Sequence, residues 1–204
     1  VLWKLAADQK AKRRAFMYSV PLLGVALWSY AWYFAPLPDG LTGKVDKTGY
    51  CGQTTDDSCS NCAAAMLLAK HGIETNEREM AELSLTRAGM GTPPLGLYRG
   101  LWIKTRSRNL RPKLVSVSGP KELASLGDAS IIAVGVKKSA PLDVQRKMME
   151  YGWQPGQRHA VVVMQADPQG KWLDIADPTF GRERWPTKDI EYLWDGQALY
   201  LSPQ

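Results

Sequence analysis

The sequence predicts an α+β domain, in which a helical lobe packs against an antiparallel sheet, following one membrane-spanning helix. Three observations support this class. An uncharged apolar run of helix length stands near the N-terminus, helix patterns with capping residues follow it, and short strand patterns fill the second half. Because the helices come first and the strands later, they are not expected to alternate as βαβ units.

Composition narrows the class of protein further. The 204 residues suffice for one domain of roughly 150 residues and an appendage. Hydrophobic residues make up 45% and charged residues 23%, which indicates a globular chain. The net charge is +6, but the cations either precede the apolar run or are scattered among acids. A nucleic-acid-binding surface needs a basic stripe, so no nucleic-acid partner is expected.

The first element is the expected transmembrane helix over 15–36. Residues 15–38 hold no charged side chain, and a helix needs about 20 apolar residues to cross the hydrocarbon core. Four cations precede the run within five residues, whereas the charges after it cancel. The positive-inside rule then places residues 1–14 in the cytoplasm and the C-terminal domain outside it, in the periplasm if the cell is Gram-negative.

Two other interpretations of this run stay open, a buried core helix and a cleaved signal peptide. The run is long for a signal peptide and ends in PLPDG rather than in a small-x-small cleavage site. Residues 1–14 could form a short amphipathic helix on the inner leaflet. A membrane-anchored chain would contact membrane lipid and could bind other membrane-protein subunits.

A linker over 37–49, rich in Pro and Gly, is expected to join the span to one domain over 50–204. Ser58 or Asp57 is expected to cap the first helix of that domain, with Gly72 ending it. Further helices are expected over 77–89, capped by Asn76, and over 93–107.

The residue pattern of the second half of the chain differs from that of the first half. Short runs rich in Val and Ile, or alternating in polarity, are bounded by Gly, Pro or Asp and predict strands. Short helices fit between them, and the four tryptophans of this half can line a peptide groove or, as we expect, fill the core. The predicted strands are 113–118, 130–136, 159–167, 172–177 and 197–202, the short helices 120–127, 142–152 and 187–194, and the tryptophans Trp153, Trp172, Trp185 and Trp194.

The start of the first domain helix carries a candidate nucleophile, Cys59. The unsatisfied N–H groups and the dipole of a helix N-terminus lower the pKa of a thiol and so enrich the thiolate. Only His71 and His159 can act as its base. His71 lies on the same helix, roughly 18 Å away at about 1.5 Å per residue, and cannot reach the thiol. His159 opens a predicted strand, whose edge can present it to the helix N-terminus.

Two further side chains complete this candidate site. Asp177 ends the next predicted strand and would orient the His159 imidazole if the two strands form a hairpin. Gln53 stands six residues before Cys59 and can donate its amide N–H to a developing oxyanion, beside the Cys59 backbone N–H.

Four segments together, GQTTDDSCSNCAAAMLLAKHG, GTPPLGL, HAVVVM and DIADP, resemble the bacteriocin-processing (double-glycine) cysteine peptidase family over roughly residues 50–201. That family has a papain-like fold and is best known from the N-termini of peptide-exporting ABC transporters. The resemblance implies a cysteine endopeptidase that acts on a peptide or protein substrate without a cofactor or metal. It implies that Cys59 is the nucleophile, His159 the general base, Asp177 its orienting partner and Gln53 the oxyanion donor.

The chain departs from the family beside the nucleophile, where Ser58 and Ser60 replace the usual Asp and Gly. A catalytically silent, peptidase-like accessory subunit of a larger membrane complex is therefore an alternative. A transglutaminase-like enzyme would use the same Cys-His-Asp chemistry with another acceptor.

The three cysteines allow other roles as well. Cys59 could be a structural thiol or half of a disulfide, and the sequence leaves open whether Cys51 and Cys62 pair or both stay free. A zinc site from these cysteines and His71 is disfavoured, because the chain has one C-x-x-C pair and no H-x-x-x-H pair.

Overall fold

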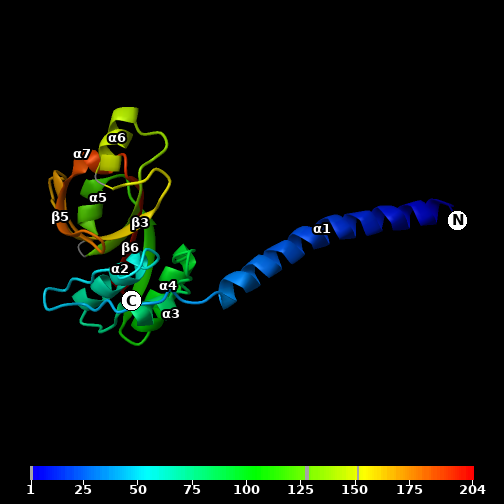
Figure 1. Cartoon of the computed structure of the whole chain (residues 1–204), viewed down its shortest axis with the longest axis horizontal. Coiled ribbons are helices and arrows are strands. Elements are labelled where there is room, and N and C mark those ends of the chain that lie inside the picture. The colour runs from blue at the N-terminus through cyan, green and yellow to red at the C-terminus, as the bar shows by residue number, and fades with distance from the viewer. Residues whose placement is uncertain (1, 127–128, 151) are drawn as a thin grey trace. The chain divides into compact units, whose positions relative to one another are not determined.

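The structure is a computed structural model that describes residues 2–126, 129–150 and 152–204, with side chains described from residue 8 onward and not at residue 147. Contacts divide the chain into two compact units, one ending at Pro36 and the other spanning Leu37–Gln204 (Figure 1). The first unit is a helix, and the second holds every strand among the described residues.

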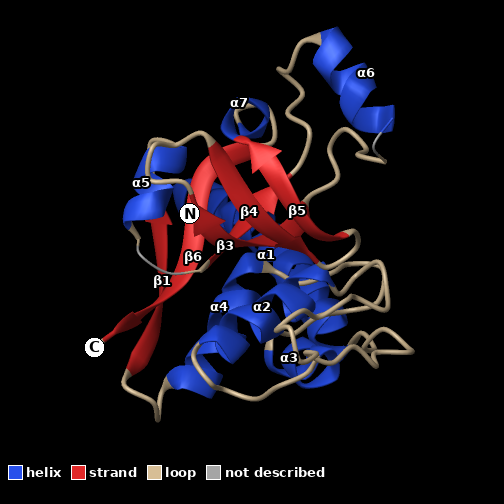
Figure 2. Cartoon of the chain, turned by 90° about the vertical axis from the view of Figure 1, so that its left-hand side faces the viewer, coloured by secondary structure: helices blue, strands red, loops and turns tan. Residues whose placement is uncertain are grey.

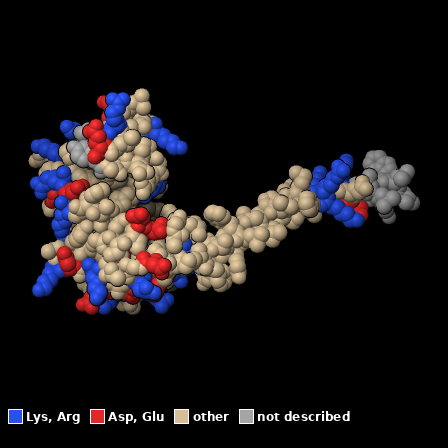
Figure 3. Space-filling model, viewed as in Figure 1, with Lys and Arg blue, Asp and Glu red and all other residues tan. Residues whose placement is uncertain are grey.

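Helix α1 (Leu2–Phe34) is continuous and contains Pro21. Its part from Asp8 to Phe34 is long and apolar enough to cross a membrane, with a mean hydropathy of 1.2 and none of its most apolar stretch buried. Figure 3 shows cations near the N-terminal part of this helix and an uncharged surface along the rest. The short helix expected over 1–14 and the span expected over 15–36 therefore run together, although residue 1 lies outside the described residues.

The segment 37–49, expected as a linker, belongs to the second unit. Pro38 and Leu41 are buried, and the Gly43 backbone N–H donates to the Glu77 carboxylate across 2.7 Å. Lys44 also forms an isolated β-bridge with Asn76. The folded contacts of this unit therefore begin before residue 50.

Three helices form the helical lobe, as the sequence predicts. They are α2 (Cys59–Lys70), α3 (Glu77–Leu83) and α4 (Pro94–Thr105), and they gather on one side of the sheet in Figure 2. Asn76 caps α3 by accepting a hydrogen bond from the Glu79 backbone N–H. Ser58 stands at the N-cap of α2, but its hydroxyl does not bond to the helix that it precedes.

Six strands form one antiparallel sheet in the order β1-β6-β2-β3-β4-β5. Five of the strands match the predicted segments to within a few residues. The fold class is thus confirmed, α+β with a helical lobe against an antiparallel sheet. The strands are β1 (Leu110–Ser116), β2 (Ser130–Val134), β3 (His159–Ala166), β4 (Trp172–Asp177), β5 (Gly181–Pro186) and β6 (Trp194–Pro203).

The sequence analysis missed β5, whose residues GRERWP are mostly charged or exposed. An edge strand pairs on one side only and needs no alternating apolar face, so its sequence lacks the pattern by which strands are predicted. Strand β1 lies at the opposite edge and contains Pro112, which an edge strand tolerates.

The sheet is buried on both faces, which explains the nearly continuous apolar run of β3. Val162 packs with α2 in one hydrophobic cluster, whereas its neighbours Val161 and Val163 pack in a second cluster. Successive side chains of a strand point to opposite faces, so each face needs its own cover. The second cluster includes residues of the short helices α5 (Pro120–Ser125), α6 (Leu142–Glu150) and α7 (Thr187–Ile190).

Candidate active site

Cys59 is the first residue of α2, the helix that packs against β3. It is partly exposed, whereas the eight residues that follow Ser60 are all buried. The thiol therefore lies where the helix N-terminus meets the surface. The unpaired N–H groups of a first helical turn favour a negative charge there.

His159 and Asp177 lie side by side on neighbouring strands. His159 opens β3, Asp177 ends β4, and the two strands pair antiparallel, which confirms the predicted hairpin. The start of one strand then stands beside the end of the next. His159 Nε2 is 2.8 Å from Asp177 Oδ1, with 16% of the histidine side chain exposed and none of the aspartate.

Backbone groups hold the Asp177 carboxylate in place. Its Oδ1 also accepts hydrogen bonds from the backbone N–H of Thr179, at 2.7 Å, and of Phe180, at 3.3 Å. Asp177 Oδ2 is buried and has no hydrogen-bond partner among the described residues. An aspartate fixed in this way orients the imidazole through Nε2 and leaves Nδ1 for Cys59.

The pKa values of the thiol and the imidazole shift in opposite directions. Burial raises the pKa of the Cys59 thiol, but the hydrogen bond and charge of His159 outweigh it, so that this pKa lies below its ordinary value. Burial lowers the pKa of His159, but hydrogen bonds to Asp177 and Cys59 outweigh it and raise this pKa to about 9. These directions favour a thiolate beside an imidazolium, the reactive form of a nucleophilic cysteine.

Gln53 lies in the loop before α2, and this loop is tied to the strand that carries Asp177. The Gln53 backbone N–H donates to the Pro178 carbonyl at 2.9 Å, and the Tyr50 hydroxyl donates to the Asp177 carbonyl at 2.9 Å. The Gln53 side-chain Nε2 donates one hydrogen bond to the Thr55 carbonyl. An amide nitrogen has two N–H groups, so one further donor is available for a substrate oxygen.

The sequence analysis missed Glu77, a fully buried carboxylate on α3. It accepts hydrogen bonds from the Thr54 backbone N–H (2.7 Å), the Thr54 hydroxyl, the Ser58 hydroxyl (2.6 Å) and the Gly43 N–H. Burial raises its pKa, but these donors outweigh burial and hold the pKa below its ordinary value. The departure from the family at Ser58 was the available signal, because a buried hydroxyl beside the nucleophile needs a partner.

The contact between the Glu77 carboxylate and the chain is close. A Cβ at Gly43 would lie 2.9 Å from Glu77 Oε2 and 2.6 Å from the Gly52 carbonyl oxygen. Only glycine lets the backbone approach so closely. Glu77 thus joins the segment around Gly43 to the loop that carries Gln53.

A partly apolar cavity of about 590 Å³ is lined by Trp153, whose ring contacts His159. The Trp153 ring meets the imidazole edge-on with centroids 5.8 Å apart, and Trp185 packs against Trp153 at the same separation. Trp153 and Trp185 thus pack against the second hydrophobic cluster, as expected of core residues, and also line this cavity. Its lining residues are Met148, Glu150, Trp153, Phe180, Glu183, Arg184, Trp185, Pro186, Asp189 and Leu193.

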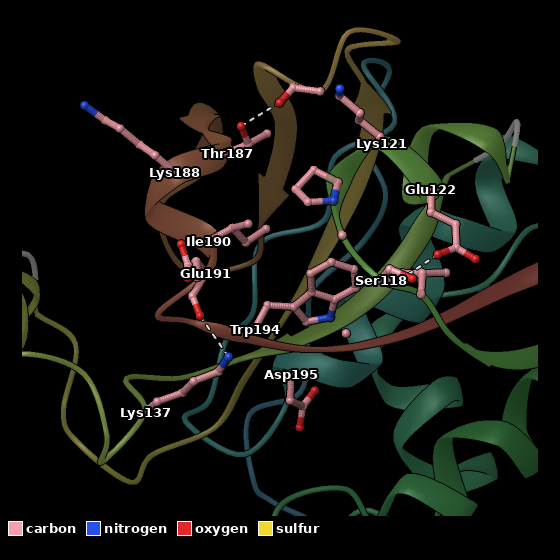
Figure 4. A pocket seen from close by; sticks show the side chains of 15 residues that line it. Ser118, Lys121, Glu122, Lys137, Thr187, Lys188, Ile190, Glu191, Trp194 and Asp195 are labelled. Atoms are coloured by element: carbon pink, nitrogen blue, oxygen red, sulfur yellow. Dashed lines mark hydrogen bonds between the residues drawn. The ribbon is translucent and has the colours of Figure 1, made fainter.

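A second cavity, of about 800 Å³, lies around Trp194, between α5 and α7 (Figure 4). Lys137 Nζ donates to the Glu191 carbonyl, and Ser118 N–H donates to the Glu122 carboxylate. Neither Cys59 nor the His159–Asp177 pair lines it. This cavity is therefore separate from the candidate active site.

Metal ligands do not gather at the cysteines. Within residues 2–126, 129–150 and 152–204, no group of three or more His, Cys, Asp or Glu side chains could hold a metal ion. The alternative of a zinc site thus finds no support in the described part of the chain.

Comparison with solved structures identifies proteins of similar fold. No protein-family model matches the sequence, and no curated protein matches it either. Among solved structures, the peptidase domain of Streptococcus ComA, a bifunctional ABC transporter of a quorum-sensing pathway, superimposes with a TM-score of 0.56 at 19% identity, covering 75% of this chain and 96% of that one.

Two other solved structures are similar. A putative C39-like peptidase from Bacillus anthracis has a TM-score of 0.55 at 17% identity, over 84% of this chain and 96% of that chain. A double-glycine motif protease of an AMS/PCAT transporter, solved with a leader peptide, has a TM-score of 0.51 at 18% identity, over 83% and 98%. This chain has the papain-like fold of the bacteriocin-processing (double-glycine) cysteine peptidase domains.

Proposed function

We propose that this protein is a membrane-anchored cysteine endopeptidase that hydrolyses a peptide bond with Cys59, His159 and Asp177, and with Gln53 as oxyanion donor. The observation that carries the proposal is the 2.8 Å hydrogen bond between His159 Nε2 and the buried Asp177 carboxylate, which leaves the other ring nitrogen to Cys59. The shifted pKa values of the thiol and the imidazole support an activated thiolate.

In the first half of the reaction, the Cys59 thiolate attacks the carbonyl carbon of the scissile bond. The negative charge that develops on the carbonyl oxygen is stabilised by the Cys59 backbone N–H and the free N–H of the Gln53 amide. His159 then gives its proton to the leaving amine, so that the C–N bond breaks and a thioester remains on Cys59.

In the second half, a water molecule replaces the amine product. His159, now neutral, takes a proton from this water as the oxygen attacks the thioester carbonyl. The second oxyanion uses the same two donors, and its collapse releases the carboxylate product and restores the Cys59 thiolate beside the protonated imidazole. Asp177 holds the imidazole in one orientation throughout both steps.

The cavity lined by Trp153, whose ring contacts His159, would accept a bulky apolar side chain of a peptide substrate. Trp153, Phe180 and Trp185 offer aromatic contacts, and among the described lining residues the carboxylates of Glu150, Glu183 and Asp189 outnumber the cation of Arg184. A cationic residue beside the apolar side chain would therefore be favoured. The similar protease solved with a leader peptide also favours a peptide substrate.

The proposed topology follows from helix α1. Residues 15–36 cross the membrane, residues 1–14 remain in the cytoplasm, and the domain over 50–204 faces the extracytoplasmic side, joined through 37–49. Lipid then surrounds α1, and other membrane-protein subunits can pack on it. The visible face of the domain in Figure 3 mixes cations with acids, which fits a peptide partner better than nucleic acid.

The test is thiol labelling across pH with iodoacetamide and a peptidyl aldehyde, applied to the full chain and to Cys59→Ala and His159→Ala. We expect rapid labelling at pH values below the ordinary thiol pKa of about 8.5, absent in Cys59→Ala and at least tenfold slower in His159→Ala. Labelling at the rate of an ordinary thiol would reject the peptidase and leave the accessory subunit.

A further inference from the structure

We propose that Cys51 and Cys62 form a disulfide that ties the loop carrying Gln53 to the helix carrying Cys59. Both side chains are fully buried, and their sulfur atoms lie 2.8 Å apart. Cys51 stands two residues before Gln53, and Cys62 lies one helical turn beyond Cys59.

The contact suits a covalent bond better than two thiols. A disulfide joins its sulfurs at about 2.05 Å, so the observed separation closes with a movement below about 1 Å. The hydrogen bond from Cys51 and burial both raise the pKa of the Cys62 thiol. Cys62 is therefore unsuited to act as a nucleophile or metal ligand, which must be thiolate.

Cys59 stays outside this pair. It is partly exposed, and its thiol interacts with His159, whereas Cys51 and Cys62 belong to the buried core between α2 and the sheet. A chain with three cysteines then keeps one reduced. Pairing the two buried thiols also prevents either of them from pairing with the candidate nucleophile.

The bond forms by oxidation. The two thiols lose two protons and two electrons as the S–S bond forms, and an external disulfide accepts both electrons and is reduced to two thiols. This oxidant is either a small-molecule disulfide, such as oxidised glutathione, or the disulfide of a thiol oxidase. The inference rests on the proposed outward orientation of the domain, since disulfides persist in oxidising compartments.

The position of the bond connects the two sides of the candidate site. Tyr50, next to Cys51, donates to the Asp177 carbonyl, and Gln53 N–H donates to the Pro178 carbonyl. The disulfide would join this segment to α2, which begins at Cys59. It would thus limit the movement of the oxyanion donor relative to the nucleophile.

The experiment is intact-mass and peptide-mapping analysis of the full chain, purified in detergent without reductant and exposed to oxidised glutathione. After any glutathione added to Cys59 is subtracted, we expect a mass lower by two hydrogen atoms, about 2 Da, than that of the reduced chain, with a peptide linking Cys51 to Cys62. Cys59→Ala should keep this difference, and Cys51→Ala should lose it. Three alkylatable cysteines after oxidation, or a bond that includes Cys59, would overturn the proposal.

A thermal measurement adds a second readout. The bond closes a loop of about ten residues, so reduction should lower the melting temperature of the wild type by roughly 5–12 °C. The double variant Cys51→Ala/Cys62→Ala is the matched control and should not respond to reductant. An equal response of both proteins would contradict the proposal.

These results are distinguishable from those that test the peptidase. A linked Cys51–Cys62 peptide together with an unreactive Cys59 would uphold the disulfide and reject the enzyme. Rapid labelling of Cys59 together with two further free thiols would uphold the enzyme and reject the disulfide.

Discussion

Two regions of the candidate site, the β3–β4 hairpin and the loop before α2, are held by different kinds of interaction. His159 and Asp177 occupy the ends of two paired strands, and their positions follow from strand register and from nearby backbone N–H groups. The loop over 51–58 has no such register. Its anchors are Glu77 on α3 and Pro178 beyond β4, both far away in the sequence.

This difference suggests that the hairpin and the loop have different roles at the candidate site. In the proposed mechanism, the hairpin brings together the two groups that would set the protonation state of Cys59, whereas the loop would position the donor for the oxyanion. A change in the hairpin should therefore alter thiol reactivity and peptide hydrolysis together. A change in the loop should reduce hydrolysis while leaving thiol reactivity largely intact.

The largest effect is expected from Asp177→Asn in the hairpin. Loss of the carboxylate lowers the pKa of His159 and favours the wrong tautomer, so the rate of peptide hydrolysis should fall by about 10³–10⁴-fold, with slower labelling of Cys59. Asp174→Asn is the matched control, because this aspartate lies on the same strand and forms an ion pair with exposed Arg184 at 2.7 Å. Equal losses in both variants would mean that the strand, not the carboxylate at its end, is responsible.

Gln53→Ala tests the loop directly. Removing one oxyanion donor should lower kcat by about 10²–10³-fold, while iodoacetamide labelling of Cys59 changes little because alkylation forms no oxyanion. Steady-state kinetics and labelling rates measured on the same preparation check this. A parallel loss of labelling would place Gln53 with the hairpin groups instead.

Glu77→Gln should have a smaller effect, because Glu77 acts through the loop as a positioning residue. The amide keeps the shape but turns one acceptor into a donor facing Thr54 and Ser58, so kcat should fall about 10–100-fold with KM nearly unchanged. Glu79→Gln is the control on the same helix, since its partly exposed ion pair with Lys104 contributes at most about 1 kcal/mol. An unchanged kcat in folded Glu77→Gln would contradict the positioning role.

The smallest expected effect is that of pH on the rate of peptide hydrolysis. Outside a plateau, this rate should change about tenfold per pH unit. The pKa of Cys59 is lowered and that of His159 is raised to about 9, so hydrolysis should be constant between these values. It should decline on the alkaline side as His159 loses its proton near pH 9. Kinetics from pH 5 to 10 check this, and a decline already centred near pH 6.5 would mean that Asp177 and Cys59 do not hold the proton.

The protonation of His159 also contributes to the stability of the folded state. A histidine whose pKa is raised from 6.5 to about 9 on folding stabilises the fold fully below pH 6.5. This contribution is lost as the pH rises through about 9. Urea unfolding of the wild type and of Asp177→Asn at both ends of that range should show the difference narrowing at high pH.

Local sequence patterns were sufficient to predict the helix and the strands that carry the candidate site. A cysteine at the start of a helix and a histidine and an aspartate at the ends of two apolar runs predicted the hairpin and the helix of the structure. The charged strand β5 was missed because it lies at an edge. Trp153 and Trp185 pack against the core as expected, but composition did not indicate that they also line a cavity.

The sequence by itself determined the order of helices and strands, the α+β class and the residue types available for chemistry, because periodicity and capping act over a few residues. Only the tertiary structure decided the partner of Ser58, the contact between Cys51 and Cys62, and the packing of Leu41 against the domain. Each of these joins separate segments of the chain. Their geometry depends on how the helices and the sheet pack, which no local pattern specifies.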